Sequence, residues 1–133
     1  MKILLDTHTW AWTLTNNTRR LSARAVELIG AAEGVFVSPL SIFEIGQKVR
    51  VGKWPEMTAF VDDLPSIAQD QGASFASLSP EICLQAARMP WNHRDPFDRL
   101  LAATAIDYGL VCISIDAAFD ELHGREGWLG RKW

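Results

Sequence analysis

Two short apolar segments that each end in an aspartate constrain the fold most strongly. Residues 2–5 (KILL) lead directly into Asp6, and residues 110–115 (LVCISI) lead directly into Asp116. Continuous apolar runs of this length are typical of strands that are covered on both faces, as in parallel sheets. Ligands of open parallel sheets bind at the carboxyl ends of the strands. Both aspartates are therefore predicted to lie where such a sheet binds its ligand.

The segments between these two strands alternate between apolar and helical patterns. Helices are predicted at 8–15, 22–33, 40–51, 57–71, 80–89, 97–108 and 117–122, with a kink or interruption at Pro65. Strands are predicted at 2–5, 35–37, 74–77, 110–115 and within 128–132. This alternation predicts an α/β fold whose parallel sheet is flanked by helices. No linker divides the 133 residues, so a single domain over 1–133 is expected.

Composition excludes several classes of protein. The formal net charge of −3 argues against a protein that binds nucleic acid by charge alone. Cys83 and Cys112 form no CxxC pattern, which predicts two buried free thiols rather than a zinc site or a disulfide. The first apolar run stops at Asp6, so no signal peptide is expected. No apolar stretch reaches the roughly 18 residues of a membrane span, and a cytoplasmic protein is predicted.

Three further acids are predicted to join the two aspartates. Glu44 lies between apolar neighbours early in helix 40–51, and Asp95 and Asp98 stand at the start of helix 97–108. All five can reach the same end of the sheet, where like charges would raise one another's pKa values. Mg²⁺ or Mn²⁺, which prefer carboxylate oxygen, would remove that cost. Such a site suits phosphodiester hydrolysis, because a bound metal lowers the pKa of water and stabilises the leaving oxygen.

Each acid also has a purely structural interpretation. Asp6, Asp95 and Asp116 all precede predicted helices, where an aspartate side chain can serve as the N-cap. Glu44 could form an ion pair with Lys48, one helical turn further on. Asp98 would stand at the third position of its helix, where the helix dipole favours an acid. The residue pattern alone leaves both interpretations open.

Four segments of the chain resemble the motifs of PIN domains of the VapC toxin group. They are MKILLDTHTWAW (1–12), VSPLSIFEIGQKVRVGKW (37–54), HRDPFDRLLAATA (93–105) and SIDAAF (114–119). The segments occur in the order of that family and span residues 1–119. The resemblance implies a three-layer PIN-like fold, with a mainly parallel sheet of about five strands flanked by helices.

The resemblance also implies a function and a set of site residues. PIN domains bind Mg²⁺ or Mn²⁺ and cleave single-stranded RNA, and the catalytic and metal-binding acids would be Asp6, Glu44, Asp98 and Asp116. Asp98 is chosen because its spacing from the helix face at 102–103 matches the family's acid. Asp95 is then a cap or an outer member of the cluster. VapC proteins usually form homodimers and are held inactive by a cognate antitoxin, so the implied partners are RNA, an antitoxin and a second copy.

Several neighbouring residues are candidates for supporting roles. Thr7 and Ser114 could hydrogen-bond the carboxylates or a bound water, or could cap the strand ends. Arg99 adjoins the third-motif acid and could bind an RNA phosphate or pair with the acids. His8 and His93 are candidate general bases, but His8 is expected to start a helix and His93 to belong to a loop.

Basic and aromatic residues supply candidates for RNA contacts. Two basic groups are Lys48, Arg50 and Lys53, and Arg88, Arg94 and Arg99. Either group could bind RNA phosphates or form a solvated helix face. The candidate tryptophans are Trp10, Trp12, Trp54 and Trp91. They could stack on bases, cover an antitoxin or dimer contact, or lie in the core.

Three other functions share some of these sequence features. A haloacid dehalogenase-like phosphohydrolase needs a second acid where His8 stands, so that match fails. A structure-specific DNA nuclease of the flap type shares a related core, but such enzymes are usually longer and carry more acids. A catalytically inactive PIN-like module that binds RNA or protein would often lack some of the four acids, all of which are present here.

Overall fold

The computed structural model describes residues 1–15 and 18–133, and its centre is a sheet of five parallel strands. The strands are β1 (Lys2–Leu5), β2 (Gly34–Val37), β3 (Ser74–Phe75), β4 (Val111–Ile113) and β5 (Arg131–Lys132). Their order is β3-β2-β1-β4-β5, and every neighbouring pair is parallel. Strands β2 and β3 lie on one side of β1, whereas β4 and β5 lie on its other side. The carboxyl ends of β1 and β4 therefore flank the switch point, where open α/β sheets bind ligands.

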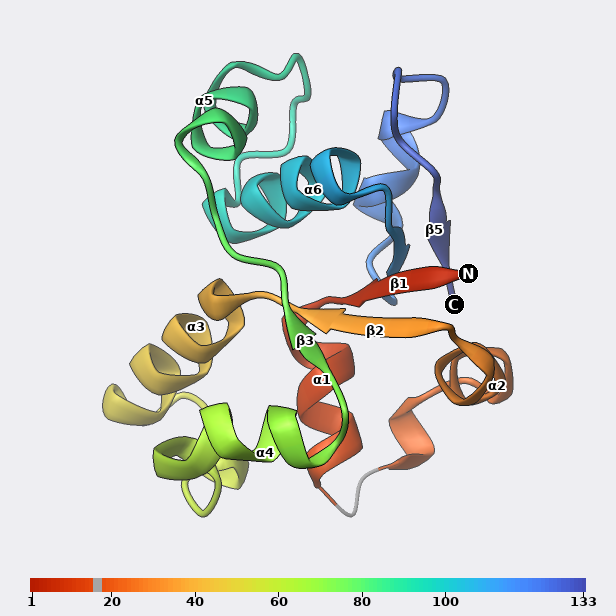
Figure 1. The fold of residues 1–133 in the computed structure, drawn as a ribbon. Helices are drawn as coiled ribbons and strands as arrows, with labels where there is room; N and C mark the ends of the chain where they lie inside the picture. Colours follow the sequence, from red (N-terminus) through yellow and green to blue (C-terminus); the bar gives the residue numbers. More distant parts are fainter. Residues whose placement is uncertain (16–17) are drawn as a thin grey trace.

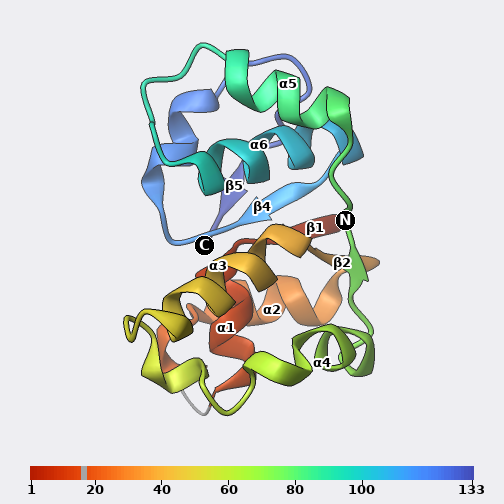
Figure 2. The same ribbon diagram turned by 90° about the vertical axis from the view of Figure 1, so that its left-hand side faces the viewer.

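Helices cover both faces of this sheet (Figures 1 and 2). One layer contains α1 (Thr7–Leu14), α2 (Ala23–Ala31), α3 (Pro39–Arg50) and α4 (Leu64–Asp70). The opposite layer contains α5 (Pro80–Arg88), α6 (Pro96–Tyr108) and the 3-10 helix η4 (Ala117–Leu122). The short 3-10 helices η1 (Thr18–Arg20), η2 (Pro55–Met57) and η3 (Val61–Asp63) complete the described elements. The predicted three-layer fold with five strands is confirmed.

The central strand shows why this sequence forms a covered sheet. Successive side chains of a strand point to opposite faces. Ile3 and Leu5 pack into the core formed with α1–α4, whereas Leu4 packs against Leu101 of α6. All of these side chains are at most 2% exposed. A strand segment that is buried on both faces must be apolar, as Ile3 to Leu5 are, and the polar residue that follows them, Asp6, stands where the strand ends.

The structure corrects the prediction of one kinked helix over 57–71. That segment instead contains η3 and α4, and η2 ends at Met57. Pro65 lies in the first turn of α4. A backbone N–H at that position would have no partner within the helix, so proline loses no helical hydrogen bond there. The proline therefore marks the beginning of a helix rather than a kink within one.

The cysteine prediction is correct in part. Both thiols are free, and Cys112 is buried in β4. The expectation of burial is wrong for Cys83, which is exposed on α5 because the neighbouring Ile82 and Ala86 take the core-facing positions of that helix. Among the described helices, none combines the length and the apolar character that a membrane crossing requires.

Candidate metal centre

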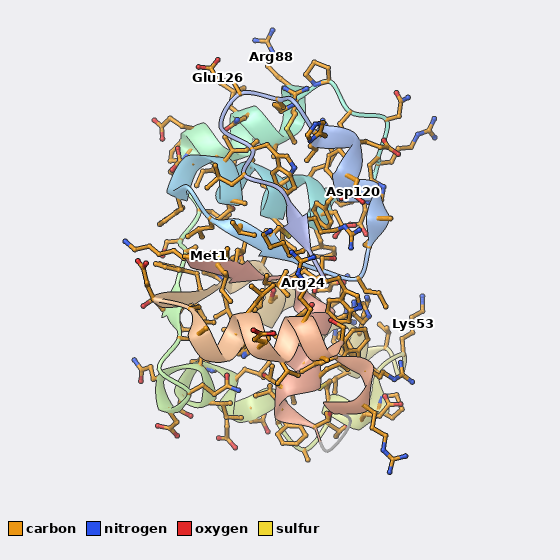
Figure 3. The ribbon with its side chains drawn as sticks, turned by 90° about the vertical axis from the view of Figure 1, so that its right-hand side faces the viewer. Met1, Arg24, Lys53, Arg88, Asp120 and Glu126 are labelled. Atoms are coloured by element: carbon orange, nitrogen blue, oxygen red, sulfur yellow. The ribbon has the colours of Figure 1, made fainter. Side chains whose placement is uncertain are left out.

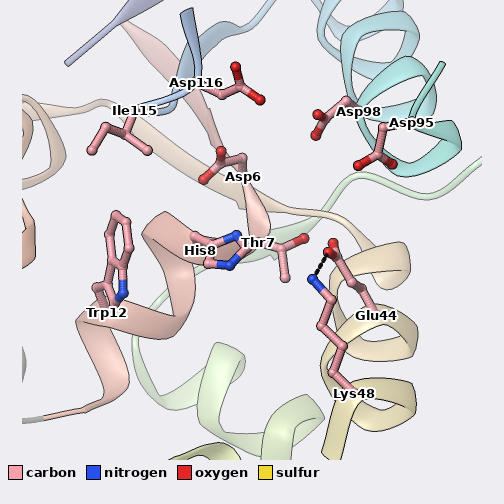
Figure 4. Close-up of a pocket in the computed structure, with 10 residues that line it drawn as sticks. All are labelled: Asp6, Thr7, His8, Trp12, Glu44, Lys48, Asp95, Asp98, Ile115 and Asp116. Atoms are coloured by element: carbon pink, nitrogen blue, oxygen red, sulfur yellow. Dashed lines mark hydrogen bonds and ion pairs between the residues drawn. The ribbon is translucent and has the colours of Figure 1, made fainter. Parts of the chain in front are cut away.

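A pocket of about 360 Å³ opens at the carboxyl ends of β1 and β4. Its lining residues are Asp6, Thr7, His8, Trp12, Glu44, Lys48, Asp95, Asp98, Ile115 and Asp116. All five acids that were predicted to meet at this end of the sheet are among them. Figure 4 shows their carboxylates turned toward a common space.

Asp6 is the most rigidly held of these acids. One carboxylate oxygen accepts a hydrogen bond from the Thr9 backbone N–H at 2.9 Å and so caps α1, while the other accepts one from the Ser114 hydroxyl. The side chain is only 6% exposed, and this burial raises its pKa above the ordinary value, against the opposing effect of both hydrogen bonds. Capping and a place in the pocket are therefore compatible roles for one carboxylate.

Ser114 links the acids at the ends of the two central strands. Its hydroxyl donates to Asp6 and accepts a hydrogen bond from the Asp116 backbone N–H at 3.0 Å. Asp116 in turn caps η4 through the Ala118 N–H at 2.9 Å. Ser114 thus contacts a carboxylate, as the sequence suggested. Thr7 does not, because its hydroxyl lies 2.9 Å from that of Ser41 on α3.

Glu44 reaches the pocket from α3, and the ammonium group of Lys48 lies beside its carboxylate. Its side chain is about 10% exposed and accepts a hydrogen bond from Lys48 Nζ at 2.8 Å, so the predicted ion pair is present (Figure 4). The Lys48 ammonium also lies 5.4 Å from the centroid of the Trp54 ring, which stacks on His8 at 4.7 Å. Glu44 therefore lines the pocket with its charge balanced by a side chain that a metal ion would have to displace or share.

The start of α6 supplies the other two acids. Asp95 accepts a hydrogen bond from the Phe97 backbone N–H at 2.9 Å and is the N-cap of the helix. Asp98 lies in the first turn, and its side chain is 18% exposed. Burial raises the pKa of Asp98 to about 6, although a hydrogen bond with His93 opposes the shift. The acid that the family resemblance selected is the more buried of the two.

His93 is the site contact that the sequence interpretation missed. Its Nε2 lies 2.7 Å from Oδ2 of Asp98, and its ring packs against Trp91 with a centroid separation of 4.9 Å. Sequence reasoning treated this histidine as a loop residue, and it does lie in a loop. The sequence did contain a signal for this contact. His93 stands two residues before the N-cap of α6, so its loop leads directly into the helical turn that carries Asp98.

Arg99 is placed differently from what the sequence suggested. Its guanidinium donates hydrogen bonds to the backbone carbonyl oxygens of Ala86, Met89, Trp91 and His93. It is therefore neither paired with the acidic cluster nor turned outward to a phosphate. Instead it ties the end of α5 and the following loop to α6, and that loop presents His93 to Asp98.

The donor set of the pocket fits a hard divalent cation. Asp6, Asp98 and Asp116 offer carboxylate oxygens, which are the ligands that Mg²⁺ and Mn²⁺ prefer. Burial raises the pKa values of Asp6 and Asp98, so the charged forms of both acids are costly in the protein alone. A bound divalent cation would lower that cost.

Comparison with known proteins identifies the fold family. The family model of the PIN domain matches residues 3–124. The chain belongs to the PIN-domain family. Ribonuclease VapC22 of Mycobacterium tuberculosis is 27% identical over 118 residues, which cover 86% of each protein. The resemblance to VapC-type PIN domains, which the four sequence motifs indicated, is confirmed.

A solved structure is similar to this PIN domain over its whole length. The structure is that of VapBC2 from Rickettsia felis bound to a DNA fragment from their promoter. One of its chains matches with a TM-score of 0.68 and 12% identity, covering 100% of this chain and 99% of that chain. At this level of identity the match supports the fold alone.

The basic and aromatic candidates of the PIN domain lie in the pocket, in the core or on the surface. Lys48 and Trp12 line the pocket, whereas Trp10 is fully buried in the core. Lys53 and Arg88 point outward from the two opposite helix layers (Figure 3). Of the basic candidates that the sequence suggested, only Lys48 lines the pocket.

We expect Asp98→Asn to stabilise the metal-free PIN domain at neutral pH. The pKa of Asp98 rises from 3.8 to about 6 on folding, so its ionisation opposes folding. This cost is absent below pH 4, grows between pH 4 and 6, and is complete above pH 6. The variant should gain about 1–2 kcal/mol in free energy of unfolding at pH 7 and progressively less toward pH 4.

Urea unfolding in EDTA across this pH range measures the effect of that substitution. Asp62→Asn, which removes an exposed acid of η3, is the matched control for the loss of one negative charge. A variant at Asp98 that gained no more stability at pH 7 than at pH 4 would contradict the assigned pKa shift.

Proposed function

We propose that this PIN-domain protein is an endoribonuclease that cleaves single-stranded RNA with the help of Mg²⁺ or Mn²⁺. The observation that carries the proposal is the convergence of five acids on one pocket at the carboxyl ends of β1 and β4. The similarity to Ribonuclease VapC22 supports RNA as the substrate. The catalytic and metal-binding set is Asp6, Glu44, Asp98 and Asp116. Residues 1–133 act together as one nuclease domain.

The side chains of the pocket suggest how they would share the chemistry. Asp6, Asp98 and Asp116 would hold the ion, with Glu44 completing the set. A bound divalent ion supplies a Lewis acid for the phosphate and lowers the pKa of water at the site. Ser114 keeps the Asp6 carboxylate oriented through its hydrogen bond. Asp98 and Asp116 already bring one carboxylate oxygen each within 4.8 Å of the other.

One wall of the pocket supports a role in RNA binding. Lys48 now pairs with Glu44. Once a bound metal ion balances the charge of Glu44, the Lys48 ammonium is free to bind an RNA phosphate. His8 is exposed, and its ring is backed by the stacked ring of Trp54. Nucleobases stack on such rings without sequence preference. With a net charge of −3, the chain is expected to depend on the bound cation for much of its attraction to RNA.

We further propose that the protein is the toxin of a toxin–antitoxin pair. The similarity to a chain in a VapBC2 structure supports a partner protein of the antitoxin type. A second copy of the chain is the other proposed partner, by resemblance to the VapC group. The action of such a toxin on cellular RNA would take place in the cytoplasm.

Cleavage of matched nucleic acids tests the proposed substrate. The purified chain is incubated with end-labelled single-stranded RNA of mixed sequence, the same RNA as a duplex, and DNA substrates that include a flap, all with Mn²⁺. We expect internal cuts in the single-stranded RNA and at least about tenfold slower cleavage of the duplex. Preferential cutting of the flap would favour a structure-specific DNA nuclease. Tight RNA binding by folded, metal-loaded protein without cleavage would favour an inactive binding module.

A further inference from the structure

A histidine nitrogen stands among the acids of the proposed metal site. One ring nitrogen of His93 and one carboxylate oxygen each of Asp98 and Asp116 all lie within 4.8 Å of one another. The carboxylate set that defines the proposed nuclease site does not include this histidine. Its contact with Asp98 nevertheless places a nitrogen donor where an ion bound to Asp98 and Asp116 would meet it.

The observed spacing suits a shared ion with little rearrangement. Two adjacent ligands of an octahedral ion, with bonds of about 2.1 Å, are separated by roughly 3 Å. Nε2 of His93 and Oδ2 of Asp98 are 2.7 Å apart, a separation now bridged by a hydrogen bond. Replacing that proton by a metal ion would need only a small increase in the distance between the two atoms.

The loop that carries His93 is held in place independently of any ion. Arg99 Nη1 donates to the backbone carbonyl of His93 at 2.9 Å and to that of Trp91 at 2.8 Å. The His93 ring also packs beside the ring of Trp91. Ligands whose supporting residues are fixed in this way need less ordering when an ion binds.

We propose that His93 is a nitrogen ligand of the bound ion and biases this PIN domain toward a first-row transition metal such as Mn²⁺ over Mg²⁺. Mg²⁺ strongly prefers oxygen ligands and retains its waters, whereas transition-metal ions accept imidazole more readily. The inference rests on the proposed function, because the carboxylates of that site supply the other ligands. It assigns the metal preference to one side chain outside the acidic set.

Pulsed electron paramagnetic resonance of the Mn²⁺-loaded full chain tests this assignment directly. A nitrogen bound to Mn²⁺ produces a ¹⁴N coupling in the spectrum, and wild-type protein should show it. His93→Gln should lose the coupling. His8→Gln should keep it, and this is the matched control because His8 is the other histidine near the acids and itself lines the pocket. Circular dichroism establishes that each variant is folded.

Equilibrium binding of Mn²⁺ and Mg²⁺ provides the second readout. His93→Gln should weaken Mn²⁺ binding by about 10–100-fold and Mg²⁺ binding by less than about 3-fold. Mn²⁺ bound at the acids without ¹⁴N coupling in wild type would overturn the inference and leave the nuclease proposal intact. Equal weakening of both ions by His93→Gln would also overturn it, by showing that His93 only orients Asp98. Failure of the wild type to bind either ion would overturn both proposals.

Discussion

Asp6→Asn should reduce the rate of RNA cleavage by about 10²–10³-fold or more while leaving the protein folded. The loss of a charged ligand removes several kcal/mol of metal-dependent stabilisation from the transition state. Asparagine keeps the side-chain oxygen that caps α1, and it is as good an N-cap as aspartate. It also removes the cost of a charge whose pKa is raised by burial.

Single-turnover cleavage rates and urea unfolding, measured on the same preparations, check both halves of this expectation. Asp120→Asn is the matched control, because Asp120 is an exposed acid that pairs with Arg131 rather than with the pocket. Its cleavage rate should stay within about twofold of the wild type. If Asp6→Asn cleaved as fast as Asp120→Asn, Asp6 would not belong to the catalytic set.

Arg99→Met should lower the free energy of unfolding by about 2–4 kcal/mol. The substitution keeps most of the apolar stem but leaves four backbone carbonyl oxygens without the donor that now satisfies them. Arg99→Lys should recover only part of the loss, because one ammonium group cannot reproduce the planar fork of the guanidinium.

Urea denaturation compares these variants with Arg94→Met, which removes an exposed arginine from the same sequence motif. The control should change stability by less than about 0.5 kcal/mol. If Arg99→Met were no less stable than Arg94→Met, the guanidinium would not be holding the loop that presents His93. Arg99 would then be available for the RNA contact that the sequence suggested.

Local patterns in the sequence predicted which acids line the pocket. Asp6 and Asp116 each follow an apolar run, and the end of a buried strand is a local event that the sequence displays directly. Glu44 and Asp98 were placed by helical spacing and by the family motifs. Capping of α1 by Asp6 and of α6 by Asp95 was one of the interpretations that the sequence left open, and both caps are present.

The parts that the sequence did not reveal depend on contacts between distant segments. Strands β3 and β5 have only two residues each, so their limits are set by pairing with a neighbouring strand rather than by their own pattern. The contact between His93 and Asp98 requires the loop conformation that Arg99 holds through carbonyls of α5 and the loop. The helical period of 57–71 likewise concealed the 3-10 helix η3, because side-chain periodicity does not separate a 3-10 helix from an α-helix over three residues.

Removal and restoration of metal during RNA cleavage tests the central claim most directly. The wild-type chain is stripped with EDTA, dialysed, and assayed on single-stranded RNA before and after addition of Mn²⁺ or Mg²⁺, with Asp6→Asn treated identically. The carboxylate site predicts no cleavage after stripping, full recovery in the wild type on addition of metal, and no recovery in Asp6→Asn. Cleavage that persists in the stripped protein, or that returns equally in Asp6→Asn, would contradict the claim that this pocket is a metal-dependent nuclease site.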